Sequence, residues 1–199
     1  ALPICERVDY TKYIDTRFSA KKDLLIDGIG LKIDVVVWKE KIREKFCIYF
    51  MNLEGVLKGR DTTSFNRNTV NFNHSVFVRS LCFDRDSATS LTTDDSGNEQ
   101  IAFDDQPSNR TFLRKVKKEI QEAIDDALTA FLSAQATKAV QDMMDRESFP
   151  TFSDDIPGQL QKKDLMTVTQ ELYKLDARIF YKLKPIQEKS LLGFINLLL

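Results

Sequence analysis

Alternating apolar and polar residues in the first hundred positions predict β-strands. Between Leu31 and Trp38, branched apolar side chains occupy every second position, and the polar residues Lys32 and Asp34 lie on the other face. Three further strand-like segments follow, at Phe46–Asn52, at residues 53–60 and at Asn71–Phe83. The links between these segments are charged or carry turn glycines. We therefore expect hairpins that build an antiparallel sheet with one face covered.

Beyond the strands, the pattern becomes helical. Residues 84–109 are rich in Asp, Ser, Thr, Gln and Asn, and they predict a surface loop. After Ser108 or Asn109, either of which can cap a helix, apolar residues recur in steps of three and four. These residues are Leu113, Val116, Ile120, Ile124, Ala127 and Phe131. They predict one amphipathic helix of about ten turns that continues toward Phe149–Pro150.

The remaining residues predict shorter helices. Pro157 and Gly158 interrupt the chain, and a second apolar stripe runs from Leu165 to Leu183 with Asp164 as its cap. Pro185 opens a third helix, because a first helical turn does not need its missing amide proton. The predicted fold class is α+β, with an antiparallel or mixed sheet packed on a long helix and a C-terminal helical hairpin. The predicted domains are residues 1–150 (sheet and long helix) and residues 151–199 (helical extension).

Composition narrows the class of protein. The 199 residues are 42% hydrophobic and 30% charged, and the net charge of -1 gives no overall attraction to nucleic acid or to an anionic membrane. Three cysteines and one histidine predict neither a disulfide framework nor a zinc site, so a cytoplasmic location is expected. No leader and no bilayer-spanning apolar run is recognised, and no membrane partner is expected. The apolar segment LLGFINLLL suggests a piece of a longer polypeptide.

The segment DLLIDGIGLKID resembles a nucleotide-binding loop of the D-x-G-x-G type. Aligning Gly28 and Gly30 with that motif places Ile26 where the adenine-binding aspartate must stand. Asp27 is one residue late, which in a strand directs its side chain to the opposite face. The alternative is a turn between two strands, in which glycine supplies a positive φ. We favour the turn.

Other reactive residues are interpreted as structural. His74 lies on the apolar side of a predicted strand, and a half-buried, hydrogen-bonded structural role is favoured over that of a general base or ligand. Cys47 and Cys82 would form a catalytic dyad only if His74 reached one of them, so no catalytic residue is predicted. Adjacent aspartates such as Asp154–Asp155 diverge along a helix or strand, and we predict no metal site. Convergence of such pairs in a hydrolase or nuclease stays a third hypothesis.

A basic run lies at the start of the long helix. It consists of Arg114, Lys115, Lys117 and Lys118. These residues would form a patch for phosphate or nucleic acid, and the alternative is a solvated helix face.

A longer pattern points to a family. The order of IDGIGLKIDVVVWKEKIREKFCIYFMN, GRDTTSFNRNTVNFNHSVFVRSLCFD, the long helix and ESFPTF resembles the second domain of bacterial GHKL-type ATP-binding proteins. These are distant relatives of the mismatch-repair and heat-shock ATPases, and the resemblance covers about residues 20–150. It implies a transducer domain that packs on an ATP-binding domain and passes the nucleotide state to a helical dimerisation region. ATP and Mg would then be bound by a missing N-terminal domain, and this chain itself would hold no cofactor.

The resemblance also implies a basic residue that senses the γ-phosphate. Lys39 and Lys41 are the preferred candidates, Arg60 and Arg67 compete with them, and the alternative is that all four are solvated loop charges. The expected function is a non-catalytic transducer and dimerisation fragment of a larger ATP-regulated protein, which forms a homodimer through its helices. The alternative is a protein or nucleic-acid interaction module of a bacterial defence or repair system.

Overall fold

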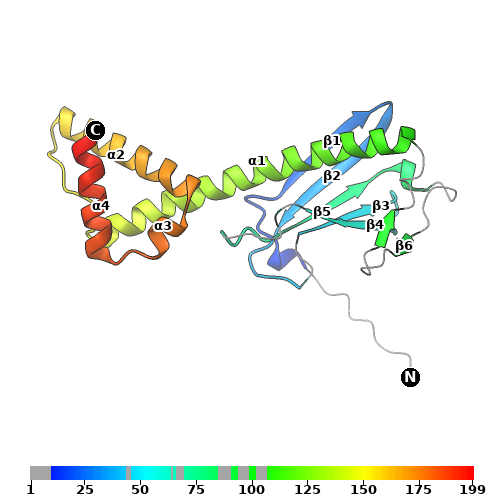
Figure 1. Cartoon of the computed structure of the whole chain (residues 1–199), viewed down its shortest axis with the longest axis horizontal. Coiled ribbons are helices and arrows are strands. Elements are labelled where there is room, and N and C mark those ends of the chain that lie inside the picture. Colours follow the sequence, from blue (N-terminus) through cyan, green and yellow to red (C-terminus); the bar gives the residue numbers. More distant parts are fainter. Residues whose placement is uncertain are drawn as a thin grey trace, which may run out of the picture. The chain divides into compact units, whose positions relative to one another are not determined.

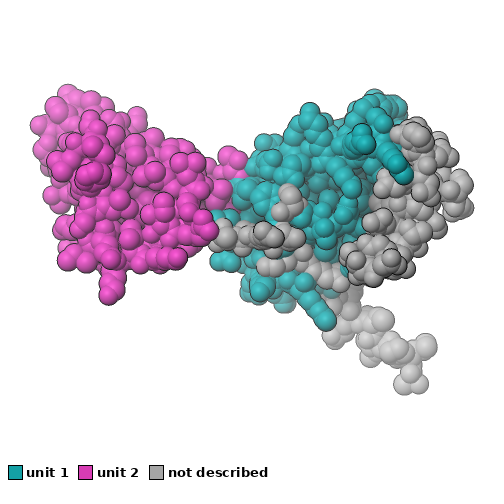
Figure 2. All heavy atoms as spheres, in the orientation of Figure 1, with its two compact units in different colours: residues 1–128 teal, residues 129–199 magenta. Residues whose placement is uncertain are grey.

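The computed structural model describes residues 10–43, 46–63, 65, 70–84, 91–93, 99–101 and 107–199. It has an α+β fold, in which a five-stranded mixed sheet is followed by a long helix and C-terminal helices (Figure 1). The chain forms two compact units, residues 1–128 (unit 1) and residues 129–199 (unit 2), which Figure 2 colours separately. This division falls inside the long helix, whereas the sequence-based domain limit lies after it, at residue 150.

Unit 1 begins with a tight hairpin between β1 (Ala20–Ile26) and β2 (Ile29–Val37). Asp27 and Gly28 form its two-residue loop, and both have positive φ, 51° and 80°. This is the geometry of a type I′ turn, which favours Asp-Gly because its twist matches that of the flanking strands. The interpretation of this segment as a turn between strands is confirmed.

The sheet continues through β3 (Cys47–Met51), β4 (Leu57–Thr62) and β5 (His74–Arg79). The strand order is β1-β2-β5-β3-β4. The pairing of β3 with β5 is parallel and every other pairing is antiparallel, so the sheet is mixed. Hairpin reasoning alone places β2 beside β3, but β5 lies between them. The link from β4 to β5 has to pass β3, which lies between these two strands, and a two-residue hairpin turn joins only adjacent strands.

The sheet has an inner face that packs against α1 (Pro107–Asp145), the predicted long helix (Figure 1). Residues at alternate positions of the three central strands are buried there. They are Leu31, Ile33, Val35, Ile48, Phe50, Val76 and Val78, each 5% exposed or less. The predicted apolar stripe of α1 covers them with Leu113, Val116, Ile120 and Ile124. Removal of these apolar side chains from water stabilises the packing of the helix on the sheet.

The opposite, outer face of the sheet carries a different set of side chains. The register places Lys21, Asp34, Phe77, Tyr49 and Arg60 in one row that crosses all five strands. The Phe77 and Tyr49 rings are stacked, with centroids 5.1 Å apart. These side chains are half-buried or exposed, in contrast to those of the inner face.

The segment predicted as a loop between β5 and α1 contains regular structure. A 3-10 turn, η2 (Leu81–Asp84), follows β5, and β6 (Leu91–Thr93) pairs with β7 (Glu99–Ile101) in a separate two-stranded ladder. These strands are three residues long, too short to produce a periodic pattern in the sequence. The helix α1 begins at Pro107, so the predicted caps Ser108 and Asn109 lie inside its first turn.

Unit 2 contains α2 (Ile156–Leu175), α3 (Arg178–Tyr181) and α4 (Pro185–Leu198) in addition to the end of α1. The start of α2 was predicted too late. Asp155 caps the helix by accepting a hydrogen bond from the Gly158 amide (2.9 Å), and Pro157 is tolerated in the first turn. The predicted cap Asp164 lies within α2. The stripe predicted to reach Leu183 is broken after Leu175, whereas α4 begins at Pro185 as predicted.

A buried carboxylate joins α4 to the chain that follows α1 within unit 2. Glu188 is 4% exposed, and it accepts hydrogen bonds from the Ser148 hydroxyl (2.9 Å) and from Arg146 (3.1 and 3.2 Å). A buried charge of this kind is tolerated only when it is paired and hydrogen-bonded. No local pattern predicts this contact, because its partners are about 40 residues apart along the chain.

Candidate functional site

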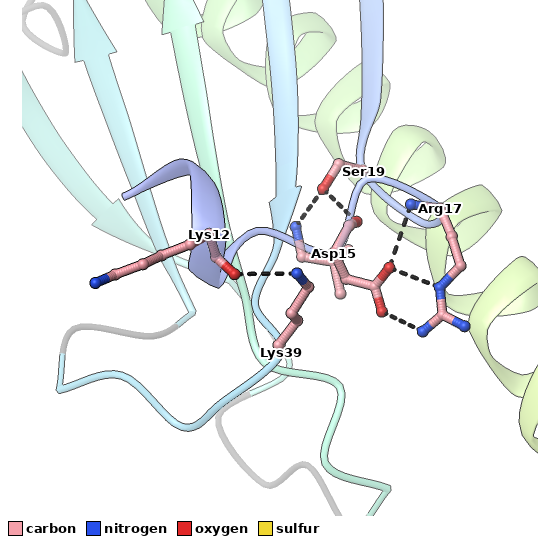
Figure 3. A network of polar contacts seen from close by, with 6 residues as sticks. Lys12, Asp15, Arg17, Ser19 and Lys39 are labelled. Carbon is pink, nitrogen blue, oxygen red and sulfur yellow. Dashed lines mark hydrogen bonds and ion pairs between the residues drawn. The ribbon is translucent and has the colours of Figure 1, made fainter. Parts of the chain in front are cut away.

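The candidate site lies where β2 ends and the chain that precedes β1 returns beside it (Figure 3). A 3-10 turn, η1 (Thr11–Tyr13), leads into an isolated bridge between Ile14 and Trp38. The Lys39 amide donates to the Tyr13 carbonyl oxygen (2.9 Å), and the Lys39 ammonium donates to the Lys12 carbonyl oxygen (3.0 Å). Both ends of Lys39 are therefore tied to η1, although its side chain remains exposed.

A buried carboxylate lies at the centre of this corner. Asp15 is 7% exposed, and Arg17 binds both of its oxygens, Nε at 2.9 Å and Nη2 at 2.7 Å. These hydrogen bonds from Arg17 hold the pKa of Asp15 below its usual value against the opposing effect of burial, and the charge of Lys39 acts in the same direction. Asp15 thus remains ionised, and the corner combines one carboxylate with two cations.

Hydrogen bonds from the backbone fix the same corner. The Ser19 hydroxyl donates to the Asp15 carbonyl oxygen (2.9 Å) and accepts from the Val37 amide (2.9 Å), as drawn in Figure 3. The Asp15 amide donates to the Val37 carbonyl oxygen (2.7 Å). Sequence reasoning missed Asp15, Arg17 and Ser19, since the short polar run before β1 looks like any solvated loop.

The other predicted phosphate sensors do not gather at this corner. Lys41 is exposed in the link between β2 and β3. Arg60 lies opposite Tyr49 on the outer face of β4, separated from β2 by β5 and β3, or by about 14 Å at ordinary strand spacing. Arg67 lies outside the described residues. Lys39 is consequently the candidate with the most defined position.

The basic run of α1 fastens the helix to the sheet. Lys115 pairs with Asp27 in the β1–β2 turn (2.6 Å), and Lys117 pairs with Asp61 on β4 (2.8 Å). Lys118 lies 3.5 Å from Glu122, one turn along the helix. Arg114 is exposed. The predicted phosphate patch remains a hypothesis, but three of its four residues already have carboxylate partners in unit 1.

His74 has the structural role that its position predicted. It is fully buried, its Nδ1 lies 3.2 Å from the Phe72 carbonyl oxygen, and its Nε2 lies 3.1 Å from the Thr63 hydroxyl. A carbonyl oxygen can only accept, so we assign the proton to Nδ1 and the acceptor role to Nε2. Burial lowers the pKa of His74 to about 4. Both ring nitrogens are occupied, and neither partner is a thiol.

The remaining candidate chemistry is limited. In the part of the chain that the structure describes, no group of three or more His, Cys, Asp or Glu side chains is placed to hold a metal ion. Asp155 instead caps α2. Ile26, which occupies the aspartate position of the nucleotide motif, is 9% exposed. Among the helices of the described residues, none combines the length and apolarity needed to cross a bilayer.

Comparison of the chain with known protein families, with curated proteins and with solved structures found no match.

Proposed function

We propose that this chain is a non-catalytic transducer and dimerisation segment of a larger ATP-regulated protein of the GHKL type. The observation that carries the proposal is the continuity of α1. This helix spans 39 residues, about 58 Å at the standard rise, and contributes to both compact units. A displacement of its sheet-bound half would therefore be transmitted along one hydrogen-bonded element to the helices of unit 2.

Lys39 is the proposed input. Its ammonium donates to a neutral carbonyl oxygen of Lys12. A γ-phosphate oxygen is a stronger acceptor, because a hydrogen bond between two charged groups is stronger than one to a neutral group. Transfer of the ammonium from Lys12 to phosphate would remove one of the hydrogen bonds that hold η1 to the end of β2. The ion pairs of Lys115 and Lys117 with the sheet would carry the resulting shift to α1.

The complete polypeptide encoded by the gene provides the test. Lys39→Ala should lower ATP turnover by at least about tenfold and should weaken the binding of ATP more than that of ADP, as expected for a charge that contacts the γ-phosphate. Lys41→Ala, an exposed lysine two residues away, is the matched control and should retain activity. Equal turnover in both variants would exclude Lys39 as the sensor.

Absence of catalysis in the isolated chain is tested separately. The purified 199-residue protein should not hydrolyse ATP. Turnover that is lost on Asp27→Ala would overturn the whole proposal, since it would restore nucleotide chemistry to the β1–β2 turn. Sequencing upstream of this segment should reveal a D-x-G-x-G motif.

The dimerisation part of the proposal is supported by α4. This helix buries Leu192 and Ile195 but leaves Ile186, Phe194 and Leu197 exposed by 75%, 61% and 83%. Helices pair through apolar side chains of this kind. Light scattering should report a dimer that the double substitution Phe194→Ser and Leu197→Ser converts to a monomer. A wild-type monomer at all concentrations would contradict this part alone.

An interaction module that binds protein or nucleic acid through Arg114, Lys115, Lys117 and Lys118 is the second candidate. It would require the lysines to exchange their carboxylate partners for phosphates. Binding of a single-stranded oligonucleotide that weakens steeply with salt, and that is lost on Arg114→Glu, would favour it.

A further inference from the structure

An exposed row of apolar side chains lies at one end of the sheet in unit 1. We call it the apolar rim, and it consists of Leu25, Leu53, Val56, Leu57 and Leu81. Their exposed fractions run from 41% for Leu57 to 72% for Leu25. Single exposed apolar residues are ordinary, but a contiguous set marks an interaction surface.

Strand register brings the rim together. β1, β3 and β5 run in one direction, and β2 and β4 run in the other, so the last residues of the first three lie beside the first residues of the other two. Leu25 pairs with Gly30, and the Ser80 hydroxyl donates to the Gly30 carbonyl oxygen (2.7 Å). Leu81, the next residue after Ser80, therefore lies at the same end of the sheet as Leu25.

The other half of the rim is joined to Ser80 in the same way. The Ser80 amide donates to the Met51 carbonyl oxygen (3.2 Å), and Met51 pairs with Leu57. Leu53 and Val56 belong to the turn between β3 and β4, which the Asn52 amide closes by donating to the Val56 carbonyl oxygen (3.1 Å). The rim thus extends across all five strands, about 19 Å from edge to edge at ordinary strand spacing.

Gly30 leaves a gap in the rim. This glycine is exposed, and a Cβ added there would meet no atom within 4 Å. Its backbone does not require positive φ. A side chain is therefore tolerated by the fold at this position, and its absence leaves room between Leu25 and Leu81 for an apolar side chain from a partner.

The outer face beside the rim is basic. Lys32 and Arg79 lie opposite each other in the cross-strand row next to it, and Lys21 and Arg60 lie in the following row. Asp23 and Asp34 are the acidic residues of the same two rows, and Asp34 is paired with Arg79. The two rows together thus carry four basic and two acidic side chains on the same face of the sheet. This excess of positive charge favours a partner with acidic residues on that side.

The spacing of the rim fits a helix. Neighbouring strands are about 4.8 Å apart, close to the 5.4 Å rise of one helical turn, so apolar residues at three- and four-residue steps would meet successive strands. We propose that the apolar rim binds an amphipathic α-helix of a partner protein, with its apolar stripe on the rim and its acidic flank on Lys32 and Arg79. This binding does not depend on the proposed nucleotide relay.

Two other occupants fit less well. The turn between β3 and β4, beyond the rim, carries Glu54, which would repel an anionic bilayer, whereas Asp27 in the β1–β2 turn is already paired with Lys115. A second copy packed through the same surface would bring two basic outer faces together.

The experiment measures binding of fluorescent helical peptides to the full 199-residue chain. One designed peptide of about 15 residues carries leucines in three- and four-residue steps with a glutamate flank, and a second replaces the glutamates by lysines. Saturable binding of the glutamate peptide, at least about tenfold tighter than the lysine peptide and weakened by salt, is expected. Equal affinity for the two peptides, or no saturable binding, would overturn the proposal.

Variants locate the binding surface. The double substitution Leu25→Ser and Leu81→Ser should lower the affinity for the glutamate peptide by about tenfold or more, and so should the single substitution Gly30→Trp. Lys32→Glu should also lower the affinity for the glutamate peptide, but it should leave the affinity for the lysine peptide unchanged or increase it. Leu175→Ser, which alters an 82% exposed leucine in unit 2, is the matched control and should change nothing. Circular dichroism verifies that each variant folds. An unchanged affinity in the folded rim variants would refute the assignment.

Two further measurements separate the rival occupants. Binding to vesicles of anionic phospholipid that is lost in the Leu25→Ser, Leu81→Ser variant would assign the rim to a membrane and overturn the helix proposal. Self-association lost in that same variant would assign it to a second copy. The helix proposal is supported if the glutamate peptide binds, anionic vesicles do not, and the rim substitutions leave the oligomeric state unchanged.

Discussion

The two faces of the five-stranded sheet differ in how their side chains are held. On the inner face, residues such as Ile33, Phe50 and Val78 are almost fully buried against α1. On the outer face, alternate residues of the same strands are half-buried and include charged and aromatic groups, such as Tyr49, Phe77 and Arg79. A one-residue step along a strand thus separates a side chain that stabilises the fold from one that is available for contacts.

At the margins of the inner face, ion pairs rather than apolar contacts join α1 to the sheet. Lys115 and Lys117 reach from α1 to carboxylates near opposite edges of the sheet. These ion pairs are about half exposed, so water and salt screen them and each contributes little to stability. They fix the position of the helix on the sheet more than they stabilise it. We therefore expect substitutions to lower the free energy of unfolding most on the inner face and least at the margins of the sheet.

The largest difference is expected between two adjacent aromatic residues of β3. Phe50→Ala on the inner face should lower the free energy of unfolding by about 3–5 kcal/mol, because it removes a fully buried ring and leaves a cavity. Tyr49→Ala on the outer face should cost less than half of this, chiefly the stacking with Phe77. Urea unfolding of the two variants measures the ratio. Similar losses would show that both faces are equally buried.

An intermediate effect is expected from pH. The pKa of His74 is lowered from 6.5 to about 4 in the folded protein, so the unfolded chain takes up a proton at higher pH than the folded one. The stabilisation from keeping His74 neutral is complete above about pH 6.5 and is lost as the pH falls toward 4, by about 3 kcal/mol in total.

Urea unfolding at several pH values, for wild type and for His74→Asn, isolates this contribution. Between pH 6.5 and pH 5 the wild type should lose stability, whereas the variant should be nearly insensitive. Carboxylates such as Asp15, whose pKa is lowered, should contribute only at more acidic pH. A parallel pH dependence of the two proteins would contradict the neutral, buried state of His74.

The smallest effect is expected at the sheet margin. A double-mutant cycle with Lys117→Met and Asp61→Asn should give a coupling of about 0.5 kcal/mol that decreases with added salt. The Lys118–Glu122 pair, which lies within one helix, is a control with no role in docking the helix on the sheet. A coupling that does not respond to salt would indicate a buried pair.

The elements with strong periodicity were predicted well. Alternation identified β2 and β5, an apolar run identified β3, and the glycine turn that precedes it identified β4. Three- and four-residue steps identified α1 and the later part of α2. Local chemistry was also readable where one residue type suits one geometry, as with Asp27-Gly28 in the turn and Pro185 at the first position of α4. The prediction was wrong where local signals competed. Pro157 and Gly158 look like a break, but Asp155 supplies a cap that lets α2 begin there.

The candidate site was predicted only in part. Lys39 stood out because basic residues follow the end of a predicted strand, but its partners Lys12 and Asp15 did not. Likewise, Lys115 and Lys117 appeared as a phosphate patch because the sequence does not show that Asp27 and Asp61 lie beside them. Partners that are 27 to 88 residues apart along the chain leave no trace in a local pattern.

The sequence by itself determined which residues form strands and helices and which side of each element is apolar. Periodicity fixes these features, because each backbone geometry sends side chains to a given face at its own repeat. Only the tertiary structure decided that β5 inserts between β2 and β3, which lysines meet carboxylates, and that the apolar rim collects residues from four segments. These outcomes depend on the free energy of contacts between distant segments, which no spacing along the chain records.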